Sequence, residues 1–370
     1  MKRKAILLAL LGACGSFAAS QAAEPNVPII KVKAETPLQL PEGMHFGEVP
    51  GVAVNKKGHV FVYTRSDISG PAYGARAGQI LEFDQTGKFV REIGRNLYAW
   101  GYAHQLRVDK DDFLWAVDKG TNTVVKFDDN GHVIDVYGRP EESTEWRSLP
   151  PRNEKPNTKA PEHKMGEFDN QTDIAWDSKG NFYITDGYGN SRVVKFSKDG
   201  NWIKGWGERG TGPGQFATPH QLVIDNRDNI YVSDRGNARI QVFNTDGKFL
   251  RQFSIQNQIP LPPNFKPRGD DPTVKKAYPD APPQLLSVAP GAGNGMCITP
   301  GPDQVLYISD IGPSRIYKVS LDGKVLGMFG GRGIKVGEFN TTHELSCPDN
   351  KTIWAADMFN WRVQKVTILE

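Results

Sequence analysis

One motif recurs through this chain of 370 residues: an Asp, a short turn, and then a strand of apolar and basic residues. Five copies align on that Asp, which occupies positions Asp118, Asp186, Asp234, Asp310 and Asp357. A degenerate sixth copy, residues 52–64, precedes them. Each full copy has four short apolar segments joined by polar turns, a pattern typical of antiparallel hairpins. Four-stranded sheets repeated six times predict an all-β fold, a six-bladed β-propeller, because closure into a ring leaves only short, protected sheet edges.

The ends of the chain indicate how such a ring would close. The last copy ends directly after its third strand, so its fourth strand is missing. Residues 29–34 have strand character and no partner of their own, and we expect them to form the outer strand of the last blade. Residues 24–370 are then expected to form a single domain. Two long Pro-rich connections, 139–167 and 257–292, follow fourth strands; connections of this length are usually functional or disordered, and tolerated surface insertion is the alternative.

Charge and the N-terminal segment narrow the class of protein. The chain has 45 Lys and Arg against 42 Asp and Glu. Three of the basic residues precede an apolar stretch at 5–13, and residues 1–23 together resemble a signal peptide with a cut after Ala22. Without them the charges balance, which excludes a basic nucleic-acid footprint. We expect a periplasmic or secreted monomer with no transmembrane segment; lipid anchoring at Cys14 is the alternative.

Two cysteines, Cys297 and Cys347, remain after the predicted cleavage. Both lie on strand-like segments, which favours two buried, unbonded side chains. A disulfide is the alternative, since an exported protein can form one.

Three histidines occupy one position of the repeat. His104, His220 and His343 each precede the Asp of their copy by 14 residues. They fall in the second, fourth and sixth copies, so a ring of six blades would place them 120° apart at the start of the inner strands. Three convergent imidazoles with an open fourth position are typical of a catalytic zinc site. A histidine that only caps a strand or bonds a neighbouring blade is the alternative.

The loop after each Asp should lie at the same mouth of the ring as the histidines. Arg65, Tyr188 and Arg235 stand in such loops. Arginine suits a carboxylate through paired hydrogen bonds, and a tyrosine beside zinc could act as a base. Purely structural roles remain the alternative for each of them. Lys119 holds the same position in the second copy, and we expect it to be solvated.

Three segments of the chain resemble a known family. They are residues 186–192 (Asp-Gly-Tyr-Gly-Asn-Ser-Arg), 219–222 (Pro-His-Gln-Leu) and 233–240 (Ser-Asp-Arg-Gly-Asn-Ala-Arg-Ile). The repeats resemble NHL repeats, and the combination is similar to peptidyl-α-hydroxyglycine α-amidating lyases over residues 46–366. NHL repeats alone say little about function, because they build many binding scaffolds.

The resemblance implies a zinc-dependent carbon–nitrogen lyase that splits a peptidyl or N-acyl α-hydroxyglycine into an amide and glyoxylate. Zinc would be held by His104, His220 and His343. Tyr188 matches the family's catalytic tyrosine, Arg235 the arginine that supports it, and Arg65 the arginine of the first blade. A structural calcium would be held by the carbonyls of Val52 and Leu106 and the carboxylate of Glu344. The substrate would be a small molecule or peptide with a C-terminal carboxylate.

The sequence departs from the family at three positions, which are Glu344 in place of Asp, Thr341 in place of Met and Gly189 in place of Cys. Two other functions fit the same residues. One is a non-catalytic propeller that binds a peptide, a glycan or a protein at this mouth. The other is a metal-dependent, lactonase-like hydrolase, although such enzymes rely mainly on acidic and Asn ligands.

Overall fold

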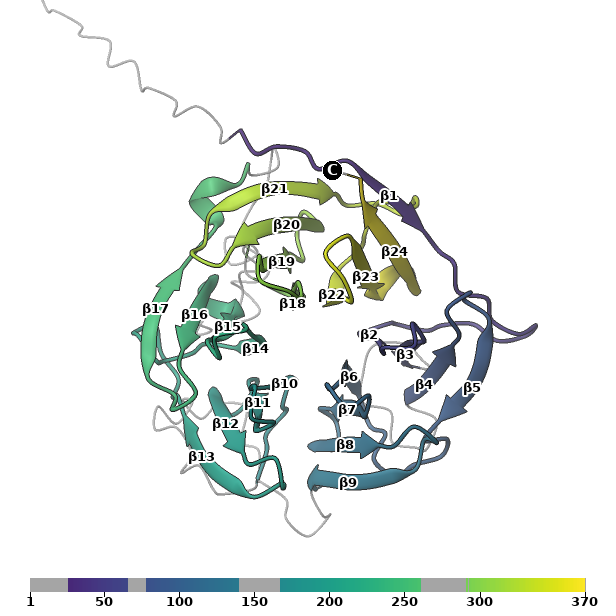
Figure 1. Cartoon of the computed structure of the whole chain (residues 1–370), viewed down its shortest axis with the longest axis horizontal. Coiled ribbons are helices and arrows are strands. Elements are labelled where there is room, and N and C mark those ends of the chain that lie inside the picture. Colours follow the sequence, from purple (N-terminus) through teal and green to yellow (C-terminus); the bar gives the residue numbers. More distant parts are fainter. Residues whose placement is uncertain (1–25, 66–77, 140–166, 261–290, 292, 370) are drawn as a thin grey trace, which may run out of the picture.

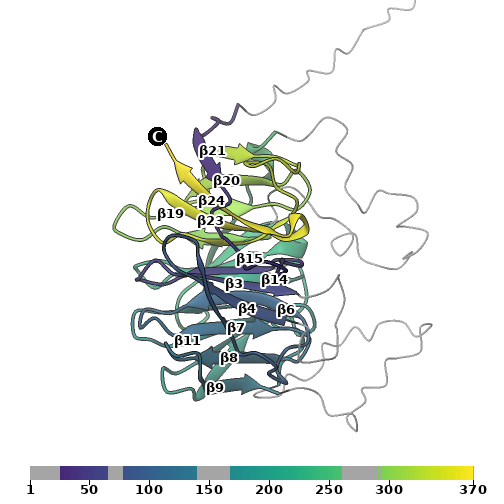
Figure 2. The ribbon, with the colours of Figure 1, turned by 90° about the vertical axis from the view of Figure 1, so that its right-hand side faces the viewer.

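The computed structural model describes residues 26–65, 78–139, 167–260, 291 and 293–369, which form six four-stranded antiparallel sheets around one axis (Figure 1). The predicted all-β, six-bladed propeller is confirmed. The ring is wider across than it is deep along its axis, as the side view shows (Figure 2). The helices of the described residues are 3-10 turns of three residues each, at Arg235–Asn237, Gln256–Gln258 and Met358–Asn360.

The strands of the first three blades run outward from the axis in chain order. Blade 1 comprises β2 (Gly51–Val54), β3 (Val60–Arg65), β4 (Gly78–Phe83) and β5 (Phe89–Ile93). Blade 2 comprises β6 (Ala103–Val108), β7 (Leu114–Asp118), β8 (Thr123–Phe127) and β9 (Val133–Gly138). Blade 3 comprises β10 (Asp173–Trp176), β11 (Phe182–Asp186), β12 (Arg192–Phe196) and β13 (Trp202–Trp206).

The second half of the ring follows the same order until the last strand. Blade 4 comprises β14 (Pro219–Ile224), β15 (Ile230–Asp234), β16 (Arg239–Phe243) and β17 (Phe249–Phe253). Blade 5 comprises β18 (Met296–Ile298), β19 (Val305–Ser309), β20 (Arg315–Ser320) and β21 (Val325–Gly330). Blade 6 comprises β22 (Thr342–Ser346), β23 (Thr352–Asp357), β24 (Arg362–Ile368) and, from the other end of the chain, β1 (Val32–Glu35).

Strand β1 closes the ring as predicted. It pairs antiparallel with β24, from Val32 opposite Ile368 to Glu35 opposite Lys365 (Figure 1). The strand begins later than expected, because the residues before it contact blade 5 instead: the Ile30 N–H donates to the Met328 carbonyl at 2.9 Å. The N-terminal segment therefore ties the last two blades together.

The hydrophobic core is divided into six clusters, one at each junction between neighbouring blades. Val52 and Leu81 of blade 1 pack against Trp354 and Ala356 of blade 6, for example, and the other five junctions have equivalent clusters. Each sheet thus buries both faces, which explains why the middle strands are apolar along most of their length.

Cys297 and Cys347 form a disulfide, so the expectation of two unbonded side chains is wrong. Cys297 lies on β18 and Cys347 directly follows β22, which makes the bond a covalent link between blades 5 and 6. The cysteines are 50 residues apart, and a link across a loop of that length stabilises a fold by about 4 kcal/mol in the chain-entropy treatment.

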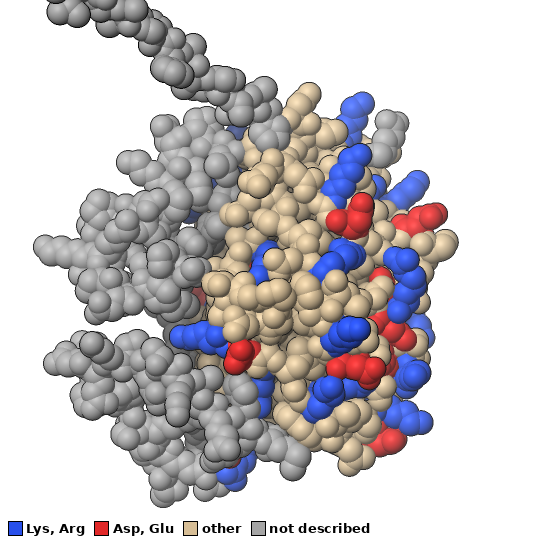
Figure 3. All heavy atoms as spheres, turned by 90° about the vertical axis from the view of Figure 1, so that its left-hand side faces the viewer, with Lys and Arg blue, Asp and Glu red and all other residues tan. Residues whose placement is uncertain are grey.

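The outside of the ring carries both signs of charge. On the flank that Figure 3 displays, Lys and Arg lie intermixed with Asp and Glu. That flank has no large single-sign patch of the kind that binds nucleic acid. Within the described residues, no helix has the length and apolar character needed to cross a membrane.

The Asp of the repeat holds the loop that leads into each inner strand. The Asp234 carboxylate accepts a hydrogen bond from the Ala217 N–H at 2.8 Å and pairs with the Arg239 guanidinium at 2.9 Å. Asp186 pairs in the same way with Arg192, and Asp357 with Arg362. In blade 5 the Asp310 carboxylate instead accepts from the Tyr317 hydroxyl at 2.7 Å and the Arg315 N–H at 3.0 Å.

Burial raises the pKa of Asp310 from 3.8 to about 6. The folded protein therefore binds this proton more tightly than the unfolded chain does, and the resulting stabilisation is lost as the pH rises from 3.8 through 6. Asp310→Asn cannot ionise, so its free energy of unfolding relative to wild type should rise between pH 4 and pH 7, by about 3 kcal/mol at most. Denaturant unfolding across that range measures it.

Asp234→Asn is the matched control. It removes the partner of the buried Arg239 side chain and should destabilise the protein at every pH in the series. A difference between Asp310→Asn and wild type that stays flat from pH 4 to pH 7 would contradict the assignment of the raised pKa.

Candidate metal centre

The three histidines of the repeat meet at the axis of the ring. The distances between ring centroids are 5.1 Å for His104 and His220, 4.7 Å for His104 and His343, and 5.1 Å for His220 and His343. Their potential ligand atoms all lie within 4.8 Å of one another. The structure thus brings together the three side chains that the spacing singles out, in a nearly equilateral triangle.

A β-bulge turns each histidine toward the axis. The pairing of inner and second strands shifts register between Ala103 and Gln105, between Pro219 and Gln221, and between Thr342 and Glu344. The skipped residue is the histidine in all three cases. Bulges re-aim a side chain in this way next to many active sites.

Backbone carbonyls of the odd-numbered blades fix the histidine tautomers. Nδ1 lies 2.7 Å from the Thr172 carbonyl in His104, 2.9 Å from the Asn294 carbonyl in His220, and 2.9 Å from the Pro50 carbonyl in His343. A carbonyl only accepts, so each Nδ1 carries the proton and each Nε2 has a free lone pair. Imidazoles that bind metals are usually oriented by such a bond.

The histidines are buried and held neutral. Burial lowers the pKa of His104 and His220 well below the ordinary 6.5, and it lowers the pKa of His343 to about 3, with the charge of Arg65 acting in the same direction. Neutral imidazole is the form that binds a metal ion. These residues therefore fit a zinc ion with three protein ligands and an open position.

Tyr188 lies beside two of the three histidines. Its hydroxyl is 3.3 Å from Nε2 of His104 and 3.2 Å from Nε2 of His220. The turn that carries it needs Gly187, since a Cβ there would lie 1.9 Å from the Pro219 carbonyl oxygen. At Gly189 the related family has Cys. Here the Gly189 N–H donates to the Asp169 carbonyl at 3.0 Å, and this hydrogen bond holds the loop.

Arg235 connects Tyr188 to the next blade. One guanidinium nitrogen lies 3.4 Å from the Tyr188 hydroxyl, and another donates to the Asn294 side chain at 3.1 Å. Burial opposes ionisation of Tyr188, but the positive charges of Arg235 and Lys119 outweigh it and lower the pKa of the phenol below the ordinary 10. The tyrosine is thereby prepared to exchange a proton.

Arg65 lies near the centre, but its guanidinium is already used. It forms a buried ion pair with Glu48 and donates to the Ala103 carbonyl through two nitrogens, at 3.0 and 2.9 Å. Its Cζ also stacks 3.7 Å from the centre of the Tyr102 ring. Arg65 therefore shapes the wall of the mouth, and its charge is already paired with that of Glu48.

The expected solvated position of Lys119 is wrong. Its ammonium lies 4.0 Å from the centre of the Tyr188 ring and 4.8 Å from that of Tyr102. Burial lowers its pKa below the ordinary 10.5. The position after the Asp of the repeat placed Lys119 at this mouth, and only the packing reveals that the side chain turns inward.

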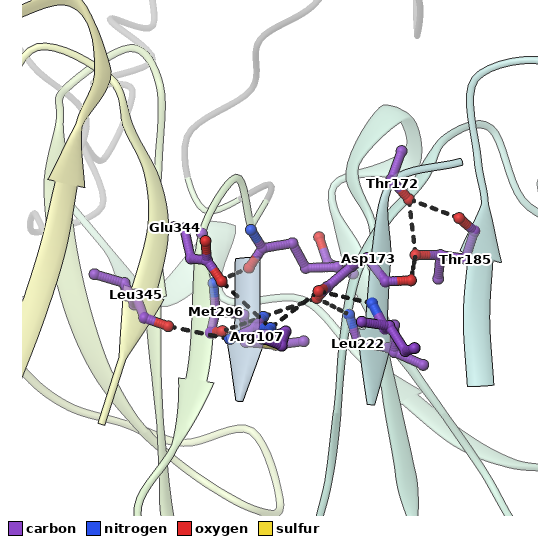
Figure 4. Close-up of polar contacts among 12 residues, drawn as sticks. Arg107, Thr172, Asp173, Thr185, Leu222, Met296, Glu344 and Leu345 are labelled. Carbon is purple, nitrogen blue, oxygen red and sulfur yellow. Dashed lines mark hydrogen bonds and ion pairs between the residues drawn. The ribbon is translucent and has the colours of Figure 1, made fainter. Parts of the chain in front are cut away.

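Of the residues expected to bind calcium, Glu344 faces a different cation, Arg107. Both inner-strand amides, Val52 N–H and Leu106 N–H, donate to Oε2 of Glu344, at 2.9 and 3.2 Å. Oε1 of Glu344 accepts no hydrogen bond, but it lies 3.3 Å from Nε of Arg107, within ion-pair range (Figure 4). A calcium ion bound to Glu344 would lie beside this guanidinium, which would repel it.

Arg107 connects the blades around the axis (Figure 4). It makes two hydrogen bonds to the Asp173 carboxylate, at 3.0 and 2.8 Å, and donates to the carbonyls of Leu345 and Met296 at 3.2 and 3.4 Å. Asp173 in turn accepts from the Leu222 N–H at 3.1 Å. Together with the bonds to Glu344, this network reaches the inner strand of every blade.

Sequence reasoning missed Arg107, Asn294 and Glu48. The residue type differs from copy to copy at each of these positions, so the repeat gives no signal for their side chains, whose contacts are set by packing. A signal did exist for Arg107, because a charged residue on an inner strand of a propeller needs a buried partner.

Comparisons with known proteins agree with the fold. A family model described as a 6-bladed beta-propeller matches residues 168–257. A solved streptogramin B lyase structure aligns with a TM-score of 0.53 and 16% identity, covering 91% of this chain and 98% of that one. At this identity the likeness concerns the fold alone.

Sequence relatives are closer. The rat peptidylglycine alpha-amidating monooxygenase is 30% identical over 232 residues, which are 56% of this chain and 22% of that protein. The mouse NHL repeat-containing protein 3 is 31% identical over 234 residues, 57% of this chain and 60% of that protein. A probable peptidyl-alpha-hydroxyglycine alpha-amidating lyase of Caenorhabditis elegans is 25% identical over 312 residues, 74% of this chain and 83% of that protein.

The chain therefore spans less than two thirds of the first two relatives. The resemblance inferred from the motifs is confirmed: this is a six-bladed β-propeller whose relatives include NHL repeat proteins and peptidyl-α-hydroxyglycine α-amidating lyases.

Proposed function

We propose that this protein is a zinc-dependent lyase that cleaves an N-acyl or peptidyl α-hydroxyglycine to an amide and glyoxylate. The observation that carries the proposal is the position of the Tyr188 hydroxyl, within 3.3 Å of Nε2 of both His104 and His220. The relatives named as lyases of this kind support it, at 25% identity over 74% of the chain for the nematode protein.

His104, His220 and His343 would hold the zinc ion through their Nε2 atoms. When bound, Zn²⁺ supplies a Lewis acid that polarises an oxygen ligand. Three nitrogen ligands without a carboxylate also argue against the lactonase-like alternative, which relies on oxygen ligands.

Tyr188 is the base of the proposed reaction. Its phenolate oxygen accepts the proton of the substrate hydroxyl as the carbon–oxygen double bond of glyoxylate forms and the C–N bond breaks. The departing amide nitrogen takes up that proton, so the products are a primary amide and glyoxylate with no further reactant. The positive charge of Arg235, 3.4 Å from the hydroxyl, favours the phenolate.

Export from the cytoplasm is part of this proposal. The predicted signal peptide, residues 1–23, lies outside the described residues, as do most of the two long connections. The disulfide between Cys297 and Cys347 supports an oxidising compartment. The second candidate function is a non-catalytic binding propeller, which the 31% identity to an NHL repeat-containing protein favours.

Glyoxylate release from N-benzoyl-α-hydroxyglycine tests the activity. His220→Ala should lower both bound zinc and turnover, because a ligand is removed. Tyr188→Phe should keep zinc and lose about a hundredfold or more in kcat, since only the proton acceptor is missing. Metal content is measured by elemental analysis and glyoxylate by a coupled assay.

His132→Ala is the matched control, because within the described residues the ring of the exposed His132 bonds only to the side chain of Asp128. It should keep full zinc content and turnover. Stoichiometric zinc without glyoxylate release from the wild type would favour the non-catalytic propeller, and unchanged turnover in His220→Ala would refute the metal assignment.

The role of the Arg107 charge at the axis of the ring can be tested separately. If Arg107 supplies the charge that a calcium ion would otherwise bring, purified protein should contain no stoichiometric calcium, and added Ca²⁺ should leave Tm unchanged. Arg107→Met leaves Glu344 and Asp173 buried without their partner and should cost about 3 to 5 kcal/mol of unfolding free energy.

Arg227→Met is the control for this series, since the Arg227 side chain is 70% exposed and its change should be nearly neutral. A rise in wild-type Tm on addition of Ca²⁺ would show that the channel binds calcium after all.

A further inference from the structure

We infer that Lys119 is an anion-binding residue of this site, and that it holds the carboxylate of the ligand at the face of the Tyr188 ring. The inference rests on the proposed function for the identity of the substrate, but not for the existence of the anion site. Neither the repeat nor the resemblance assigns a role to this lysine.

The position of Lys119 is set by the fold. Its backbone N–H donates to the Tyr102 carbonyl at 3.1 Å, which directs the side chain from the end of β7 into the mouth. The ammonium then lies between two aromatic rings, 4.0 Å from the centre of Tyr188 and 4.8 Å from that of Tyr102. It is therefore at the face of the ring whose hydroxyl contacts the histidines.

The ammonium has no acceptor among the described residues. It makes no ion pair or hydrogen bond there, and the rings that flank it offer only their faces. The neighbouring Asp118 carboxylate is fully engaged by other donors, including the Tyr63 hydroxyl at 3.1 Å and the Tyr102 N–H at 2.8 Å. Within the described part of the chain, the three N–H donors of the partly buried Lys119 ammonium therefore have no partner.

The balance of charge at the mouth points to an anion. Of the three cationic side chains there, only Arg65 has a carboxylate partner, Glu48. Arg235 contacts a neutral amide and a phenol, and Lys119 contacts two rings. Among the described residues, neither Arg235 nor Lys119 is paired with a carboxylate, and the Tyr188 phenolate supplies a single negative charge between them, so the mouth favours a negatively charged ligand.

A carboxylate is the anion that fits. With Arg65 paired to Glu48, Lys119 and Arg235 are the cationic donors near the Tyr188 ring that remain to bind it. The predicted substrates are accordingly acyl α-hydroxyglycines with a free carboxylate, and esters or amides of the same acid should bind poorly.

Binding of N-benzoylglycine tests the inference without turnover, because this compound lacks the hydroxyl that the reaction needs. Isothermal titration of the purified full chain compares it with its methyl ester. We expect Lys119→Met to weaken the binding of N-benzoylglycine by about tenfold or more. Binding of the methyl ester should stay unchanged, since only the acid loses a charge-assisted bond. Lys119→Arg should bind nearly as wild type.

Lys126→Met is the matched control. Lys126 belongs to the same blade and also lies over aromatic rings, 4.2 Å from Phe113 and 4.9 Å from Trp115, but away from the histidines. It should leave the binding of both compounds unchanged. With an active substrate, Lys119→Met should raise KM by a similar factor and change kcat much less.

The outcomes separate the two proposals. Selective loss of N-benzoylglycine binding in Lys119→Met supports the anion site even if no glyoxylate is released, and the lyase proposal would then fail alone. Equal weakening of acid and ester, unchanged binding of the acid, or no binding of the acid by the wild type would each overturn the role of Lys119, whatever the lyase assay gives.

Discussion

The guanidinium of Arg107 is the point at which the inner strands of all six blades are joined. It pairs with Asp173, reaches the carbonyls of Met296 and Leu345, and faces Glu344, which in turn binds the amides of blades 1 and 2. Burial raises the pKa of Glu344 well above its usual range, although the charge of Arg107 acts in the opposite direction. Because buried ionic groups tolerate few geometries, this network favours a single arrangement of the blades.

The metal centre depends on that arrangement through an alternation around the ring. Blades 2, 4 and 6 supply the histidines, and blades 1, 3 and 5 supply the carbonyls that bind their Nδ1 atoms. Each imidazole is thus oriented by the neighbouring blade and not by its own. A small rotation between two blades would change the direction of one lone pair, so the packing of the six inter-blade cores controls the geometry of the centre.

The positively charged side chains around the three neutral histidines differ in whether a carboxylate partner neutralises them. Arg65 is neutralised by Glu48 and stiffens the wall of the mouth through Tyr102, whereas Arg235 and Lys119 keep their charge for the Tyr188 hydroxyl and for a ligand. Burial keeps the histidines unprotonated, and the charge of Lys119, which acts on His104 in the same direction, also favours the phenolate of Tyr188. One electrostatic arrangement therefore prepares both the metal ligands and the base.

The sequence by itself determined the ring, its closure and the meeting of the histidines. These follow from periodicity, since a motif repeated six times places equivalent residues at equivalent angles, and the constant spacing of 14 residues needs no knowledge of packing. It also placed Tyr188, Arg235 and Lys119 at one mouth. Only the tertiary structure decided that Lys119 turns inward, that Arg65 is taken by Glu48, that Cys297 bonds Cys347, and that Arg107 stands where calcium was expected. Each of these depends on a contact between side chains, most often of different blades, and such contacts are set by packing distances that a repeat pattern does not contain.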